Sequence, residues 1–247
     1  MRWLIIGHSG TEAGDAVGGT PWPLLLREML AARSDEPVEV DAFRFWPAGA
    51  RAVSYALERV DSGTPDGVIL DLNAYPSTVA VVFESVRQRF GERAARRYQQ
   101  LEAFFQRRST APEGEPNHVN RIARRAARKV LGARALVDID ESAQVFAEVL
   151  RGLVQRERIE VLVLSESSFG PSVRRANPGI DAAVRRLQAP SRRIAAEQRI
   201  PWIDAGDFCP NDEDGPWAPD HIHLSALGNE LYAIGIAEAL GVRALQR

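Results

Sequence analysis

The stretch GVILDLN, residues 67–73, decides the fold class of this chain. Its aliphatic residues, Val68, Ile69, Leu70 and Leu72, follow one another with only Asp71 between them and do not alternate with polar residues. A strand of this kind is buried on both faces, which is typical of a parallel sheet covered by helices. The stretch therefore predicts an α/β protein.

Similar apolar runs lie on both sides of this stretch and alternate with segments of helical composition. The predicted strands are 2–7, 38–45, 67–72, 159–166 and 200–205, and the predicted helices are 20–33, 50–60, 78–108, 119–131, 141–156, 177–199 and 225–240. This alternation predicts a three-layer α/β/α fold around about five mainly parallel strands. We also expect Thr20 to cap helix 20–33, with Pro21 at its first helical position, and Pro190 to break or kink helix 177–199.

The length of 247 residues fits one domain, 1–247, because single cores keep growing up to roughly 250–300 residues. The connection between the third and fourth strands is much longer than one crossover helix requires. We therefore expect an insertion of extra helices over about 78–156. Inserted segments of this length are often lids over a functional site.

The chain carries a formal net charge of -2, which gives no reason to expect nucleic acid as a partner. The charge is unevenly distributed, however, because residues 84–134 hold thirteen arginines or lysines against five glutamates, a local charge of +8. This segment is either a solvated helical face or a cationic rim that attracts an anionic acyl donor or acceptor.

The sequence suggests neither a disulfide within the chain nor a membrane span. Cys209 is the only cysteine, so it has no partner within the chain, and we expect it to be a small buried residue. The apolar run Trp3–Ile6 is far too short for a signal sequence or a spanning helix. We expect a cytoplasmic protein, or a secreted one if a leader has been removed.

Polar residues follow several of the predicted strands at the point where each strand ends. Ser9 follows the first strand, Gly49 the second and Asn73 the third, and Asp220 and His223 lie in the loop after the fifth. Loops at the carboxyl ends of parallel strands meet at one edge of the sheet, where ligands bind in open α/β folds. We expect these groups to converge there.

The segment DHIHLSALGNELYA, residues 220–233, supplies what a serine nucleophile needs. Serine reacts only when a base takes its proton, and an imidazole is the better base when a carboxylate orients it. Asp220 and His223 are three residues apart, which suits this pairing better than the neighbouring His221. We predict that the Ser9 hydroxyl lies within about 2.6–3.2 Å of His223.

These blocks resemble the SGNH hydrolase superfamily, also called the GDSL-type esterases and lipases. The resemblance rests on IIGHSG at the start, a glycine after the second strand, an asparagine after the third, and DxxH before the last helix, in the order of that superfamily. It implies a flavodoxin-like α/β/α fold. Two blocks depart from the pattern: His8 replaces the usual aspartate before the serine, and Asp71-Leu72-Asn73-Ala74 replaces Gly-x-Asn-Asp, so that both the glycine and the second acid are missing.

The resemblance implies a serine esterase that forms an acyl-enzyme from a small-molecule acyl ester, with no cofactor and no metal. The nucleophile falls on Ser9, the acid on Asp220 and the base on His223. The oxyanion hole falls on the backbone N–H of Ser9, the N–H of Gly49 and the side-chain amide of Asn73.

Other functions stay open at this point. An acyltransferase of the same fold shares the acyl-enzyme and differs only in the group that resolves it. A nucleotide- or phosphate-binding domain is the alternative from another class, because glycines crowd the first loop at positions 7, 10, 14, 18 and 19. The chain lacks the spacings of the dinucleotide fingerprint and of the P-loop, and such a domain would leave Asp220 and His223 unexplained.

Overall fold

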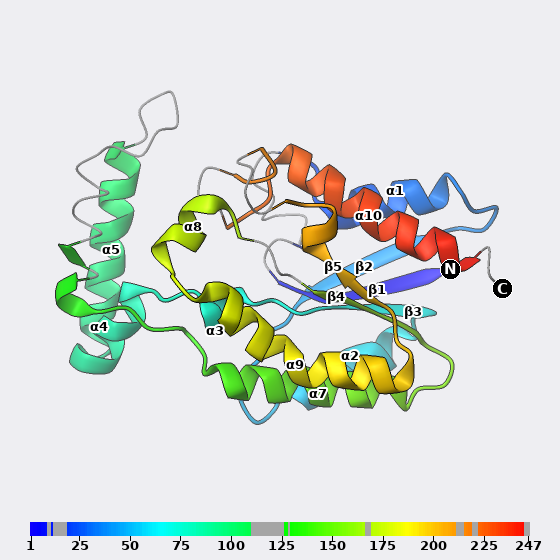
Figure 1. Cartoon of the computed structure of the whole chain (residues 1–247), viewed down its shortest axis with the longest axis horizontal. Helices are drawn as coiled ribbons and strands as arrows, with labels where there is room; N and C mark the ends of the chain where they lie inside the picture. The colour runs from blue at the N-terminus through cyan, green and yellow to red at the C-terminus, as the bar shows by residue number, and fades with distance from the viewer. Residues whose placement is uncertain are drawn as a thin grey trace. The chain divides into compact units, whose positions relative to one another are not determined.

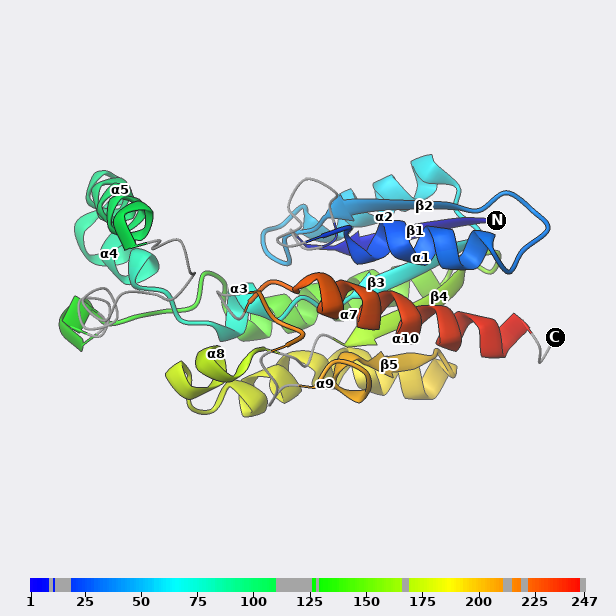
Figure 2. The same ribbon diagram turned by 90° about the horizontal axis from the view of Figure 1, so that it is seen from above.

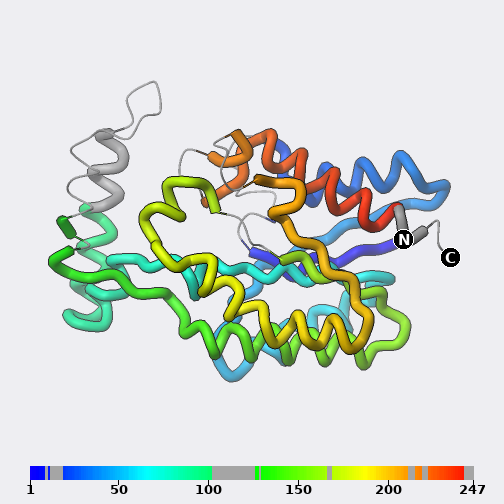
Figure 3. The backbone as a smooth tube through the Cα atoms, viewed as in Figure 1, coloured from blue at the N-terminus to red at the C-terminus, as the bar shows by residue number. Residues whose placement is uncertain are grey.

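The computed structural model describes residues 1–8, 11, 19–109, 126–127, 129–165, 169–210, 215–218 and 222–244, traced in Figure 3. The chain divides into two compact units. Unit 1 comprises Met1–Tyr75 and Val137–Arg247, and unit 2 comprises Pro76–Leu136. The two units are described separately below.

Unit 1 is built on a five-stranded parallel sheet formed by the described residues. The strands are β1 (Arg2–Gly7), β2 (Glu39–Arg44), β3 (Gly67–Asp71), β4 (Glu160–Ser165) and β5 (Trp202–Asp204). Their order is β2-β1-β3-β4-β5, which Figure 2 shows from the side of α10. The predicted parallel sheet is therefore confirmed, and β1 and β3 lie next to each other near its centre.

Helices cover both faces of this sheet, so that unit 1 has three layers (Figure 1). One layer holds α1 (Trp22–Ala31) and α10 (Ala226–Ala244), and the other holds α2 (Ala52–Gly63), α7 (Ile139–Val154) and α9 (Ile180–Gln198). The short helix α8 (Pro171–Ala176) and the turn η2 (Ala205–Asp207) follow β4 and β5. The predicted α/β/α architecture is confirmed.

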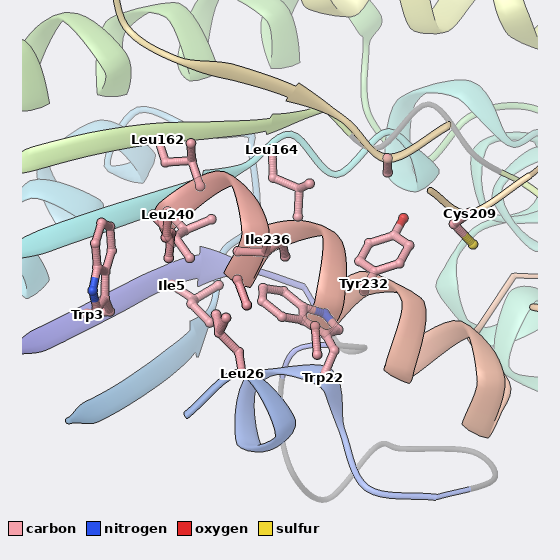
Figure 4. Packing of buried hydrophobic residues seen from close by; sticks show 14 of the residues in the cluster. Trp3, Ile5, Trp22, Leu26, Leu162, Leu164, Cys209, Tyr232, Ile236 and Leu240 are labelled. Carbon is pink, nitrogen blue, oxygen red and sulfur yellow. The ribbon is translucent and has the colours of Figure 1, made fainter. Parts of the chain in front are cut away.

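Successive side chains of each strand point to opposite faces of the sheet. Trp3 and Ile5 of β1 pack with Trp22, Leu26 and Ile236 under α1 and α10, as Figure 4 shows. Each fully buried side chain of this size contributes roughly 1.5–3 kcal/mol. The same cluster contains Cys209, which is completely buried, as its sequence context predicted.

The structure differs from the sequence prediction at two prolines, one at the start of α1 and one inside α9. The N-cap of α1 is Pro21 rather than Thr20, and the side chain of Pro21 makes no capping hydrogen bond. Pro190 neither breaks nor ends α9, which continues from Ile180 to Gln198 with the proline inside. Burial of the face that α9 presents to α7 offsets the hydrogen bond that the proline ring removes, so tertiary packing overrides the local preference.

Unit 2 is helical in its described part. It holds α4 (Val82–Phe90), α5 (Glu92–Ser109) and the short helix α3 (Tyr75–Thr78), apart from Tyr75, which belongs to unit 1. Its two ends run together, because Leu136 N–H donates to the Pro76 carbonyl at 2.8 Å and Val81 pairs with Arg134. The compact unit is thus shorter than the insertion 78–156 of the sequence analysis, since α7 packs in unit 1 against α2 and α9.

A buried carboxylate organises α4 within unit 2. Glu84 is 2% exposed, and its carboxylate accepts two hydrogen bonds of 2.8 Å from Arg87 and one of 2.7 Å from Gln88. The Arg87 guanidinium is the main reason that the pKa of Glu84 lies below its ordinary value, against the opposing effect of burial. The arginines described on α4 and α5 are exposed, which fits a solvated basic face. None of the helices in the described ranges is long and apolar enough to cross a membrane.

Candidate active site

The chain turns back directly after β1, at the carboxyl edge of the sheet. The N–H of Thr11 donates to the His8 carbonyl at 3.0 Å, and the Thr11 hydroxyl donates to the same oxygen at 2.7 Å. Gly7 is needed here, because a Cβ at this position would lie 2.4 Å from the Thr11 methyl group. Ser9, between these residues in the sequence, lies outside the described part of the chain.

Asn73 lies just beyond the end of β3, and its amide has a defined orientation. Its Oδ1 accepts the N–H of Tyr75 at 3.1 Å, while its own N–H donates to the Asp71 carbonyl at 2.9 Å. The residue is 7% exposed. This contact with the backbone fixes the orientation of the side-chain amide. Its Nδ2 group is the part that can donate to a ligand.

Gly49 follows β2 and adopts φ +90°, a conformation that favours glycine. Its N–H donates to Oε1 of Glu141, in the first turn of α7, at 2.8 Å. The predicted oxyanion donor is therefore engaged by a carboxylate in this structure. An acyl oxygen would have to replace Glu141 in order to use it.

His223 lies in a short hairpin before α10 and is partly buried. Its carbonyl accepts the Ala218 N–H at 2.8 Å, and Trp217 and Leu224 form an antiparallel bridge. Ser225 then caps α10, since its hydroxyl donates to the Gly215 carbonyl at 2.6 Å and accepts the Gly228 N–H at 3.2 Å. The backbone that carries His223 is thus held at several points.

A buried asparagine joins this hairpin to the start of α1. Oδ1 of Asn229 accepts the backbone N–H of Trp22 at 2.9 Å, and its Nδ2 donates to the Ser225 carbonyl at 2.9 Å. Asn229 is 3% exposed and Trp22 is 1% exposed. The loop that begins at Ser9 ends at α1 and the His223 hairpin ends at α10, so this contact fixes the ends of both loops against each other.

The sequence analysis missed two features of this edge. Asn229 stands in the quoted block DHIHLSALGNELYA, but its partner Trp22 is 207 residues away, so no local pattern links them. The second feature is the contact between His8, directly after β1, and Asp71, the last residue of β3. Asp220 and His221, like Ser9, lie outside the described residues, so the distance from Ser9 to His223 stays a prediction.

The fold and these residues define a class: a parallel α/β/α protein with polar groups gathered where the central strands end. No model of a protein family matches the sequence, and no curated protein matches it. Several solved structures are similar to this chain. The chain is similar to an acetyl-xylooligosaccharide esterase from Geobacillus, with a TM-score of 0.58 and 13% identity over 97% of this chain and 94% of that one.

Two other solved structures agree in fold. An acetyl xylan esterase, AlAXEase, has a TM-score of 0.55 and 18% identity over 97% of this chain and 99% of that one. A lipase/acylhydrolase from Enterococcus faecalis has a TM-score of 0.52 and 16% identity over 98% and 96%. At this identity the likeness concerns the fold. The resemblance to the SGNH hydrolases is therefore confirmed at the level of the fold.

Proposed function

We propose that this protein is a metal-independent serine esterase that acts on a small-molecule acyl ester. Ser9 attacks the acyl carbon while His223 takes its proton, and Asp220 orients the ring and stabilises its charged form. The alcohol leaves with a proton from His223. Water then attacks the acyl-enzyme with His223 again as base, which releases the acid and restores the serine.

The observation that carries this proposal is the orientation of Asn73. An oxyanion hole needs donors aimed at the developing charge, and the backbone holds this amide with its oxygen engaged and its nitrogen available to donate. Asn73 follows β3, and His8, the residue before Ser9, follows the neighbouring strand β1. The esterases and the lipase of the same fold support ester hydrolysis as the chemistry.

Gly49 is the least direct member of the proposed hole, because its N–H donates to Glu141. A carboxylate at this point opposes negative charge on the acyl oxygen. In the proposed mechanism the acyl oxygen replaces the Glu141 carboxylate at the Gly49 N–H as the substrate binds.

Hydrolysis of p-nitrophenyl esters of increasing acyl length tests the proposal, with Ser9→Ala as the matched variant. The unaltered protein should hydrolyse them in the presence of a chelator, be inactivated by a serine-directed phosphonate, and carry the label on Ser9. Ser9→Ala should lose about a millionfold in kcat, as in other triad enzymes. The rate should rise with pH as the His223 imidazole loses its proton and becomes able to act as a base.

Two results would contradict the proposal. One is substantial hydrolysis by the Ser9→Ala variant. The other is activity that disappears with a chelator and returns only with added zinc.

A further inference from the structure

The side chains of His8 and Asp71 meet where the neighbouring strands β1 and β3 end, at the edge where the proposed site lies. His8 Nε2 is 3.4 Å from Asp71 Oδ2. Only 1% of the Asp71 side chain is exposed, against 19% for His8. A buried carboxylate is costly unless a cation or hydrogen-bond donors compensate for the lost water. The imidazole is a polar group of this kind beside Asp71, and it comes from the residue directly after the neighbouring strand β1.

Each member of the pair is attached to one proposed oxyanion donor. His8 directly precedes Ser9, whose N–H is one donor. Asp71 accepts the Asn73 N–H on its carbonyl at 2.9 Å, and the Asn73 side chain is another donor. The pair therefore lies between the two chain segments whose separation sets the distance between these donors.

His8 and Asp71 are two of the positions at which the chain departs from the SGNH sequence pattern. His8 stands where that pattern has aspartate, and Asp71 stands where it has glycine. The structure brings the two side chains together, with His8 Nε2 3.4 Å from Asp71 Oδ2. Asp71 alone would add a buried carboxylate without this imidazole beside it, so the two residues suit each other as a pair.

We propose that His8 and Asp71 are positioning residues that hold the Ser9 and Asn73 donors at the separation the oxyanion requires. This inference rests on the proposed function. Such donors act at about 2.7–3.1 Å from the oxyanion, and a misplacement of 1 Å costs about a hundredfold in rate. Because the oxyanion forms only during the reaction, loss of the pair should lower kcat and leave KM nearly unchanged.

The test is a set of variants of the full chain assayed for kcat and KM on a p-nitrophenyl ester. His8→Leu leaves Asp71 without the imidazole and is expected to weaken the fold as well as the activity. The double variant His8→Leu/Asp71→Leu removes both polar groups, which is close to neutral for stability when apolar groups of similar shape replace them. Asp66→Asn, an exposed carboxylate before the other end of β3, is the matched control.

We expect the double variant to unfold at a temperature close to that of the unaltered protein and to lose about 10- to 100-fold in kcat, with KM changed by less than about threefold. His8→Gln keeps a nitrogen donor near the position of Nε2 and should restore kcat to within about threefold of the unaltered protein. Asp66→Asn should leave kcat unchanged. A merely structural role would not produce this separation of kcat from KM.

Phosphonate labelling of Ser9 separates the two proposals. If Ser9 is labelled and the folded double variant keeps its kcat within about threefold, the positioning role is refuted while the esterase stands. If His8→Gln is as slow as the double variant, the donor to Asp71 is not what matters and the inference also fails. If Ser9 is not labelled in the unaltered protein, the proposed function fails and the inference with it.

Discussion

At the scale of single residues, the side-chain amide of Asn73 combines two tasks. Its oxygen closes a local turn by accepting the Tyr75 N–H at 3.1 Å, and this contact determines which way the nitrogen faces. An asparagine at a strand end often serves only the first task. Substitutions that keep one task and remove the other can therefore distinguish a turn residue from an oxyanion donor.

Asn73→Asp keeps the oxygen that accepts the Tyr75 N–H but removes the amide donor and adds negative charge beside the oxyanion. We expect kcat to fall by at least 10²–10³-fold, the usual cost of one lost donor, while the thermal unfolding temperature changes little. Asn73→Ala removes both tasks and should lower kcat and the unfolding temperature together. Steady-state kinetics and thermal unfolding measure these effects. Full activity in a folded Asn73→Asp variant would assign Asn73 to the turn alone.

At the scale of elements, the proposed site depends on two loops that are far apart in the sequence and end at adjacent helices. The loop after β1 ends at α1, and the hairpin with His223 ends at α10. Asn229 joins the two helix starts through Trp22 and Ser225. The helix pair thus acts as the common support of the proposed nucleophile and base.

Asn229→Ala should leave the Trp22 N–H buried without this acceptor, at a cost of about 1–3 kcal/mol in the free energy of unfolding. Because both loops lose their shared support, kcat should fall as well. Asn229→Asp is the control, since its Oδ1 can still accept from Trp22 while the donor to Ser225 is lost. Denaturant unfolding and ester hydrolysis measure the two effects. Equal stability of the alanine variant and the unaltered protein would contradict the assignment.

A second prediction at this scale concerns Glu84 in α4. The pKa of this carboxylate is lowered in the folded state by Arg87, from an ordinary value of 4.5. A lowered pKa means that the stabilisation is fully present above pH 4.5 and is lost as the pH falls through the folded value. Glu84→Gln should weaken α4 measurably at pH 7 and by much less near pH 3. Hydrogen exchange of Val82–Phe90 at the two pH values measures this, and a difference independent of pH would contradict it.

At the scale of the whole molecule, a second compact unit is inserted after the strand that leads to Asn73. Its two ends meet where Leu136 donates to Pro76 at 2.8 Å. A short connection can therefore replace the rest of unit 2 without stretching the ends apart. We retain as a prediction that this insertion shapes the acyl pocket as a lid, since it leaves unit 1 next to the proposed oxyanion donor.

Replacing residues 77–135 with a short glycine-serine linker tests the lid. We expect unit 1 to keep its fold, because its sheet and both helix layers lie outside the excised segment. Hydrolysis of an acetyl ester should stay within about tenfold, whereas the preference for longer acyl chains should change. In the intact protein, hydrogen exchange in unit 2 should slow after an acyl-phosphonate binds. An unchanged chain-length preference together with unchanged exchange would exclude the lid.

The sequence by itself determined the sheet and its layers. Apolar runs such as Val68–Leu70 have to be buried on both faces, and only a parallel sheet between helices provides that, so strand positions were predicted to within a residue or two. It also predicts that Asn73 and His223 lie at one edge, because parallel strands end on the same side. These outcomes depend on periodicity and topology, which the order of residues carries directly.

Only the tertiary structure decided which partners these residues have. The Trp22–Asn229 contact, the His8–Asp71 pair and the engagement of Gly49 by Glu141 each join segments that are distant in sequence. Such contacts depend on the distance between elements after packing, which no local pattern encodes. For the same reason Pro190 continues α9 although a proline alone predicts a break: the packing of the whole helix outweighs one lost hydrogen bond.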